Sequence, residues 1–229
     1  MRNLIARLIC FWLALFSMSV FAAATVTQVS GTVNMTPKTG NAAAVALAEG
    51  QRVESGVGIK TGSNSTVTLR FDDGHMIALS SDTNFVIDDY RFNAHKPAEG
   101  GFLSTLVRGG MRSVTGLLGK ANPGDVRVKV DVATAGIRGT DFQLFYDGGR
   151  LFISVREGAI STTNAGGVSI FDAKTSPSGI VSDSQTKGRP APINDFPAPA
   201  LGSVRRLDIN PAIGTKNPSP NDPGCSDRR

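Results

Sequence analysis

The stretch VRVKVDVATAGIRGTDFQL, residues 126–144, decides the fold class of this chain. Its first seven residues place valine at every second position, with charged residues between. A period of two with β-branched side chains is typical of a β-strand that buries one face. A step of small residues around Arg138 follows, and an apolar segment resumes at Phe142. The stretch therefore predicts β-strands on both sides of a small-residue step.

The same period continues through the rest of the body of the chain. Residues 66–71, TVTLRF, alternate in the same way, and turn sequences rich in Asp, Asn and Gly separate such segments every 8 to 12 residues. Three of these turns are Asp73-Gly74, Asp147-Gly148-Gly149 and Asn164-Ala165-Gly166-Gly167. Their residues tolerate the positive φ of tight hairpins. We therefore predict an all-β fold, either a sandwich or a β-solenoid-like stack of short antiparallel strands and hairpins.

The first 24 residues have the composition of a secretory signal peptide. Arg2 and Arg7 precede a 14-residue apolar run from Leu8 to Phe21, and three alanines then form an A-x-A cleavage pattern. The run is shorter than the roughly 20 residues that cross a bilayer. An uncleaved N-terminal anchor is the alternative. We expect cleavage before Thr25, a chain that does not span the membrane afterwards, and a periplasmic or secreted location.

Charge and cysteine content narrow the set of partners. Removal of residues 1–24 leaves 205 residues and lowers the formal charge from +5 to +3, because that segment holds two arginines and no acid. No basic run is then longer than two residues, as in Arg205-Arg206, whereas nucleic-acid binding needs clustered Lys and Arg. We expect no nucleic-acid partner. Cys225 is the one cysteine left, so no internal disulfide can form, and pairing with another chain stays open.

Composition divides the mature chain near Ser184. Residues 185–229 hold eight of the twelve prolines and few apolar residues. Such a segment does not offset the entropy of ordering it, so we expect a disordered or extended tail. A piece around residues 201–209 is the part expected to dock on the body. The predicted organisation is a signal peptide at 1–24, an all-β domain at 25–184 and a Pro-rich tail at 185–229.

The sequence offers little for catalysis or metal binding. His75 and His95 have no Cys or His neighbour at ligand spacing, and no G-x-S-x-G elbow accompanies them. Asp72-Asp73 and Asp88-Asp89 are candidate calcium or glycosidase carboxylates, but they lie at a turn and at a strand end, where Asp is common. We predict that the protein is not an enzyme and holds no metal and no other cofactor.

Several blocks, taken in order, resemble the FecR-domain family. The blocks are Gly31-Thr32-Val33, Glu49-Gly50, Ile59-Lys60-Thr61-Gly62, TVTLRFDDGHMIAL (66–79), VATAGIRGTDFQL (132–144) and SVREGAI (154–160). The resemblance covers roughly residues 25–162, and the block around Ile137-Arg138-Gly139-Thr140 is its most distinctive part. It implies an extracytoplasmic all-β module.

The resemblance also implies a role in signalling. In the regulators that give the family its name, the domain helps to pass a signal from an outer-membrane receptor to a cytoplasmic sigma factor. Those regulators carry a cytoplasmic segment and a transmembrane helix before the domain. Here a predicted signal peptide occupies that place, so we expect only the periplasmic part of the role to apply.

The distinctive block raises the question of what Arg138 does. Its small, apolar neighbours favour a guanidinium held inside the fold, where it needs a carboxylate partner. Glu157 and Asp141 are the two candidates, and the sequence does not choose between them. Direct contact of Arg138 with a partner is the alternative. The predicted structural motif comprises Ala135, Ile137, Arg138, Gly139, Thr140, Phe142, Glu157 and Gly158.

Two functions of different classes remain. The first is a sensory or binding module whose strand edges or loops bind another protein of the cell envelope. The second is a structural envelope component that binds glycan or peptidoglycan through a shallow face. After signal cleavage the chain keeps two tyrosines and no tryptophan, which is poor in the aromatic rings that sugar-binding faces present. We predict the first function, with a binding site that the sequence does not locate.

Overall fold

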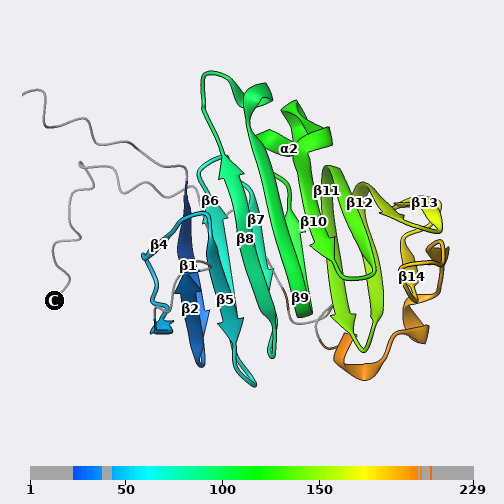
Figure 1. Ribbon diagram of the computed structural model, residues 1–229, viewed down its shortest axis with the longest axis horizontal. Helices are drawn as coiled ribbons and strands as arrows, with labels where there is room; N and C mark the ends of the chain where they lie inside the picture. Colours follow the sequence, from blue (N-terminus) through cyan, green and yellow to red (C-terminus); the bar gives the residue numbers. More distant parts are fainter. Residues whose placement is uncertain (1–22, 38–42, 201, 203–206, 208–229) are drawn as a thin grey trace, which may run out of the picture.

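The computed structural model describes residues 23–37, 43–200, 202 and 207 of the chain. Hydrogen bonds join the 15 strands of this part into one sheet, which folds over into two layers (Figure 1). Layer A contains, in spatial order, β3 (Val45–Ala46), β2 (Val33–Pro37), β5 (Val57–Thr61), β8 (Asn84–Arg91), the start of β9 (Gly101–Val114), β10 (Val126–Val130), the start of β11 (Ala133–Asp147), the end of β12 (Arg150–Asn164) and β13 (Gly167–Asp172). Layer B contains β4 (Arg52–Val53), β1 (Ala24–Ser30), β6 (Thr66–Phe71), β7 (Met76–Leu79), the other parts of β9, β11 and β12, then β14 (Ser178–Val181) and β15 (Arg189–Pro190). The all-β prediction is confirmed.

The two layers are continuous because three long strands run through both. In β9, residues 101–108 pair with β8 and β10, whereas residues 109–114 pair with β7 and β11. The change of layer falls at Gly109, whose φ is +91°. Strands β11 and β12 change layer together farther along the sheet. The architecture is therefore a sandwich whose layers share strands, with features of both alternatives that the sequence left open.

Short connections make the same change of layer between neighbouring strands. The segment from β5 to β6 passes from layer A to layer B through Asn64, and the segment from β7 to β8 passes back through Asp82. Both residues have a positive φ, 54° and 55°, a conformation that Asn and Asp tolerate better than other non-glycine residues. These turns lie along one margin of the sandwich, beside the bend at Gly109.

The core lies between the layers and follows the period of two. In β6 the side chains of Val67, Leu69 and Phe71 are buried, and the intervening side chains are only partly so. Phe71 of layer B meets Tyr90 and Phe102 of layer A edge to face, each at 5.0 Å between ring centroids. Such pairs add about 1 kcal/mol each beyond their buried area. Contacts of this kind hold the two layers face to face.

Among the described residues, the helical segments are short. A short helix, α2 (Leu117–Ala121), and two 3-10 turns, η1 (Pro97–Glu99) and η2 (Pro123–Asp125), close one end of the sandwich, as Figure 1 shows for α2. A third turn, η3 (Ile193–Asp195), follows β15. Within the described residues, no helix has the length and apolarity needed to cross a bilayer.

The ordered part of the chain extends beyond the expected boundary at Ser184. Ala191, Phe196 and Ala200 are buried and form a cluster with Phe145, Phe152 and Ile180 of layer B. Phe152 and Phe196 have ring centroids 5.2 Å apart. The few apolar side chains of residues 185–200 dock on an existing sheet and need no core of their own. Leu207 is also buried, on Met76 and Ala78. Residues 208–229, with Cys225, lie outside the described residues, as do residues 1–22.

Candidate functional site

The distinctive Arg-Gly-Thr block builds the place where β11 and β12 change layer. The two strands pair regularly up to Arg138 and Ala159, and the register then shifts before Asp141 and Glu157 pair. Gly139 has a φ of +58°. Extra residues at this point bend both strands and increase their twist. The motif therefore determines the path of the backbone at this point.

Close contact between the two strands explains the second glycine of the motif. Gly158 has a φ of +73°, and a Cβ atom there would lie 2.6 Å from the carbonyl oxygen of Gly139 and 2.7 Å from Thr140 Cγ2. The N–H of Thr140 donates to Thr115 Oγ1 at 2.9 Å, and Thr115 Oγ1 donates to the carbonyl of Thr140 at 2.8 Å. Ala135, Ile137 and Phe142 are buried in the core beside them. The predicted motif residues other than Arg138 and Glu157 thus fix the bend.

Arg138 itself is exposed, so the expectation that it is held inside the fold is wrong. Among the described residues it forms an ion pair with neither Glu157, which is also exposed, nor Asp141. The reason is the strand period: Ala135 and Ile137 point into the core, and Arg138 therefore points to the outer surface of layer A. The alternative that Arg138 faces a partner stays open.

The buried arginine of this region is Arg112, which sequence reasoning missed. Its side chain is 8% exposed; Nε lies 2.9 Å from Asp141 Oδ1, and Nη2 lies 2.8 Å from Oδ2. Nη1 donates to the carbonyl of Leu207 at 2.8 Å. Asp141, one of the two proposed partners of Arg138, thus pairs with an arginine of a different strand, β9. Nothing near Arg112 in sequence reveals this, because one of its acceptors is 95 residues away.

The outer surface of layer A carries three rows of side chains across β10 to β13. Directly paired residues share a face, so the register places Lys129, Thr134, Thr163 and Val168 in one row. Arg127, Gly136, Ser161 and Ile170 form the next row, and Arg138 and Ala159 begin a third. We call this surface the β10–β13 face. It combines three exposed cations with small hydroxyl side chains and an apolar margin, and Asp172 ends the row of Arg138.

That margin is a sheet edge. Val168 is 51% exposed and Ile170 is 67% exposed, and both project from β13. Strand β13 pairs with β12 on one side, and on its other side the described residues form a single bridge, between Asp172 and Ser176. An edge strand presents unpaired N–H and C=O groups that can pair with another chain. Exposed β-branched side chains beside such groups suit an extended apolar segment.

Residues 58–161 match the family model described as FecR protein. The resemblance to the FecR-domain family is confirmed for this region. The matched residues, here the FecR region, include β9 to β11 and most of β12, and they contain the Arg-Gly-Thr bend with Arg127, Lys129 and Arg138. Val168 and Ile170 lie just beyond the region.

Two solved structures are similar to part of this chain. Both are crystal structures of a protein described as a "putative anti-sigma factor" from Parabacteroides distasonis ATCC 8503, at 1.65 Å and 2.50 Å resolution. Each is 15% identical in sequence, with a TM-score of 0.45, and the alignment covers 58% of this chain and 57% of the other. The chain thus spans little more than half the length of these neighbours. No curated protein matches the sequence.

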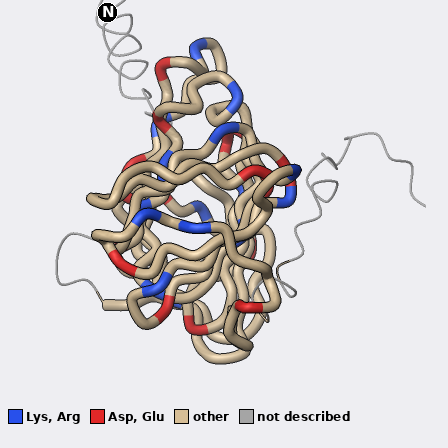
Figure 2. Tube along the Cα trace, turned by 90° about the vertical axis from the view of Figure 1, so that its right-hand side faces the viewer, with Lys and Arg blue, Asp and Glu red and all other residues tan. Residues whose placement is uncertain are grey.

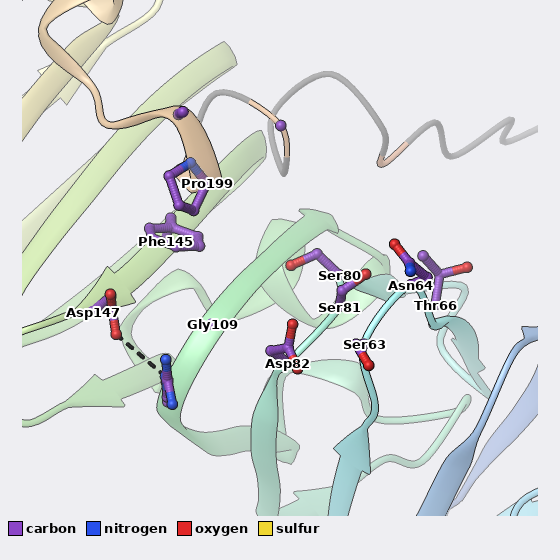
Figure 3. Close-up of a pocket in the computed structure, with 13 residues that line it drawn as sticks. Ser63, Asn64, Thr66, Ser80, Ser81, Asp82, Gly109, Phe145, Asp147 and Pro199 are labelled. Atoms are coloured by element: carbon purple, nitrogen blue, oxygen red, sulfur yellow. Dashed lines mark ion pairs between the residues drawn. The ribbon is translucent and has the colours of Figure 1, made fainter.

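The FecR region also lines a groove at the margin where the layers meet (Figure 3). Its volume is about 430 Å³. The turn residues Ser63, Asn64, Ser81 and Asp82 form one side, and Figure 3 shows Phe145 and Pro199 on the opposite side. Arg108 and Asp147 close one end with an ion pair of 3.2 Å between Nε and Oδ1. The groove offers hydroxyl, amide and carboxylate groups beside one aromatic ring.

The side chain of Asp73, also in the FecR region, is buried and holds the layers together. Asp73 accepts hydrogen bonds from Tyr90 Oη at 3.2 Å, from the N–H of His75 at 3.1 Å and from the N–H of Leu118 at 3.2 Å. Burial raises the pKa of Tyr90 above its usual value, and Asp73 adds to the rise. Asp73 thus ties layer B, layer A and α2 to one carboxylate.

His75 and Ser113 form a pair that resembles part of a hydrolase site. Nε2 of His75 lies 2.7 Å from Ser113 Oγ. Both side chains are buried, and the imidazole packs against Phe71 and Phe102 at 5.3 and 5.0 Å between centroids. Burial lowers the pKa of His75 to about 4, against a smaller opposing effect of Asp73. A substrate does not reach this pair, which therefore serves packing.

The acidic pairs that the sequence raised as calcium or glycosidase carboxylates have other partners. Asp72 binds Arg52 through both oxygens, Asp88 accepts from Thr105 Oγ1 at 2.6 Å, and Asp89 pairs with Arg91. Within the described part of the chain, no three His, Cys, Asp or Glu side chains come together as metal ligands.

Lys and Arg lie among Asp and Glu on the side that carries β13 and β14 (Figure 2).

Proposed function

We propose that this chain is an exported, non-catalytic binding module that recognises another protein of the cell envelope through the β10–β13 face. The observation that carries the proposal is the pair Val168 and Ile170, exposed by 51% and 67% on an edge strand. Soluble proteins usually blunt such edges with charge or proline. An edge left apolar is therefore a place where a partner strand can add.

Charge defines the partner further. Arg127, Lys129 and Arg138 are exposed on the same face, and they begin two strands inward from the apolar edge. Arg127 donates to the carbonyl of Gly124 at 2.9 Å and lies 3.4 Å from exposed Asp125, an ion pair that contributes little in water. A partner segment that is extended, apolar where it meets β13 and acidic where it reaches these cations fits the face. Arg138 then contacts the partner, the alternative that the sequence left open.

The FecR match supports a role in signalling across the envelope. Members of this family act as regulatory modules, and the match covers Arg138 and the bend that follows it. The predicted signal peptide supports a periplasmic or secreted location. On this proposal the module senses or transmits the state of an envelope protein by binding it, and no covalent step takes place on the module.

Site-specific cross-linking tests the proposal. A photoreactive residue at position 170 is expected to yield one defined adduct in cells, whose partner is then identified by mass and purified. Val168→Arg is expected to weaken binding of the purified partner at least tenfold. Val45→Arg is the matched control, because Val45 is 52% exposed on β3 at the opposite end of layer A. Equal loss in both variants, or loss in neither, contradicts the proposal.

The groove favours the second candidate function, glycan or peptidoglycan binding. Its hydroxyl and amide groups are suited to sugar hydroxyls, and Phe145 supplies one apolar surface. Titration with soluble peptidoglycan fragments tests this alternative. The alternative is supported if the amide resonances of Ser63, Ser81 and Asp82 shift and reach saturation. It is excluded if these resonances stay unchanged at millimolar concentrations of the fragments.

A further inference from the structure

The first strand of the sandwich begins earlier than the predicted cleavage pattern allows. Ala24 is the first residue of β1 and is fully buried in the main core. It pairs with Phe71 of β6 on one side and with Val53 of β4 on the other. Residues paired on both sides lie inside a sheet. Cleavage before Thr25 would therefore remove a core residue from a position between two strands.

Ala23 is anchored as well. Its side chain is 2% exposed, and its backbone N–H donates to Asp72 Oδ2 at 2.9 Å. Its carbonyl accepts from the N–H of Asp72 at 3.2 Å. Asp72 also accepts two hydrogen bonds from Arg52, of 2.9 and 3.0 Å. The nitrogen of Ala23 is thus one of three donors that converge on a single carboxylate.

The sequence contains a second cleavage pattern two residues upstream. Val20-Phe21-Ala22 has a small residue at the position before the cut and a compact one two positions earlier. Cleavage there keeps Ala23 and Ala24 in the chain. The nitrogen of Ala23 then becomes a free amine at the position where Asp72 already accepts a hydrogen bond.

We infer that the signal sequence is cut between Ala22 and Ala23, and that the new α-ammonium of Ala23 forms an ion pair with Asp72. This inference rests on the proposed export. Water adds across the amide bond under an envelope signal peptidase: Ala22 leaves as a carboxylate, and the nitrogen of Ala23 takes up the protons as an ammonium. The charge strengthens the existing hydrogen bond, because ionised donors bind carboxylates more tightly than neutral ones. Asp72 then clamps the first residue of the mature chain to the sheet.

The N-terminal residue of the exported protein tests the site of cleavage. Full-length protein is expressed with its own leader, isolated from the envelope or medium, and analysed by intact mass and N-terminal sequencing. A chain that starts at Ala23 is the expected result. A chain that starts at Ala24 or Thr25 overturns the inference and leaves export intact. A chain that starts at Met1 contradicts export itself and with it the inference.

Stability measurements test the role of the new terminus. Two chains, starting at Ala23 and at Thr25, are released from a cleavable fusion and melted at pH 7. The Ala23 chain is expected to melt about 5 °C higher. Asp72→Asn is expected to lower the melting temperature more in the Ala23 chain than in the Thr25 chain, which keeps only the Arg52 contact. Equal melting of the two starting chains, or equal effects of D72N, overturns the proposed ion pair.

Discussion

Arg112 and Asp141 form a bidentate ion pair on the outer face of layer B, beside Leu207, with Nε–Oδ1 at 2.9 Å and Nη2–Oδ2 at 2.8 Å. Removing one partner of such a buried pair leaves the other charge uncompensated, at a cost of about 3 kcal/mol. We expect Arg112→Ala to lower the free energy of unfolding by about that amount in urea melts. Arg138→Ala, at an exposed position, should change it by less than about 0.5 kcal/mol. The reverse ranking contradicts this assignment of the two arginines.

Gly158 tests the close contact at the bend. A methyl group there meets the carbonyl of Gly139 and Thr140 Cγ2 at 2.6 and 2.7 Å, whereas a methyl group on Gly149 meets nothing within 4 Å. Both glycines have φ near +75°. Gly149→Ala should therefore cost about 1 kcal/mol for the backbone alone, and Gly158→Ala about 3 kcal/mol once overpacking is added. Similar losses in thermal melts of the two variants speak against the contact.

His75 should make folding stability depend on pH. The unfolded chain takes up a proton near pH 6.5, but the buried imidazole has a pKa of about 4. Between these values the unfolded state binds more protons, so this contribution is fully present above pH 6.5 and is lost as the pH falls toward 4. The loss is about 3 kcal/mol. Urea melts from pH 4 to 7 measure it, and His75→Gln should flatten the dependence in this window.

An equal slope in His75→Gln and the wild type shows that another group governs the acid loss.

The segment after Ser184 should matter for stability. Phe196 is buried against Phe152, whereas Ile193 of the same segment is 37% exposed. Burial of a Phe side chain accounts for about 3 kcal/mol or more, so Phe196→Ala should lower the melting temperature by about 10 °C. Ile193→Ala should lower it by about 2 °C or less. A chain truncated after Ser184 that melts like the full chain contradicts the docking of residues 189–200.

The strands were predictable because their signal is local. The alternation in residues 66–71 and 126–130 reports burial directly, and the Asp-Gly turns report positive φ. The alternation also indicates that Arg138 is exposed, because Ala135 and Ile137 occupy the inward positions. Small neighbours do not bury a side chain that the period directs outward, so the prediction drawn from them was wrong.

Other features depend on contacts that are distant in sequence. Arg112 lies in a strand covered on both faces, and one acceptor, the carbonyl of Leu207, belongs to a segment 95 residues away. The groove combines three turns with Ala198, Pro199 and Gly202. Neither can be read from periodicity, because each arises only when the layers have packed.

Hydrogen exchange of the module with its cross-linked and purified partner tests the central claim most directly. If the partner adds to the sandwich edge, amides of residues 167–172 should exchange at least tenfold more slowly in the complex, with weaker protection in residues 159–164. Val168→Arg should abolish the protection. Protection confined to the groove, at residues 63–66 and 80–83, with none in β13, would contradict the account.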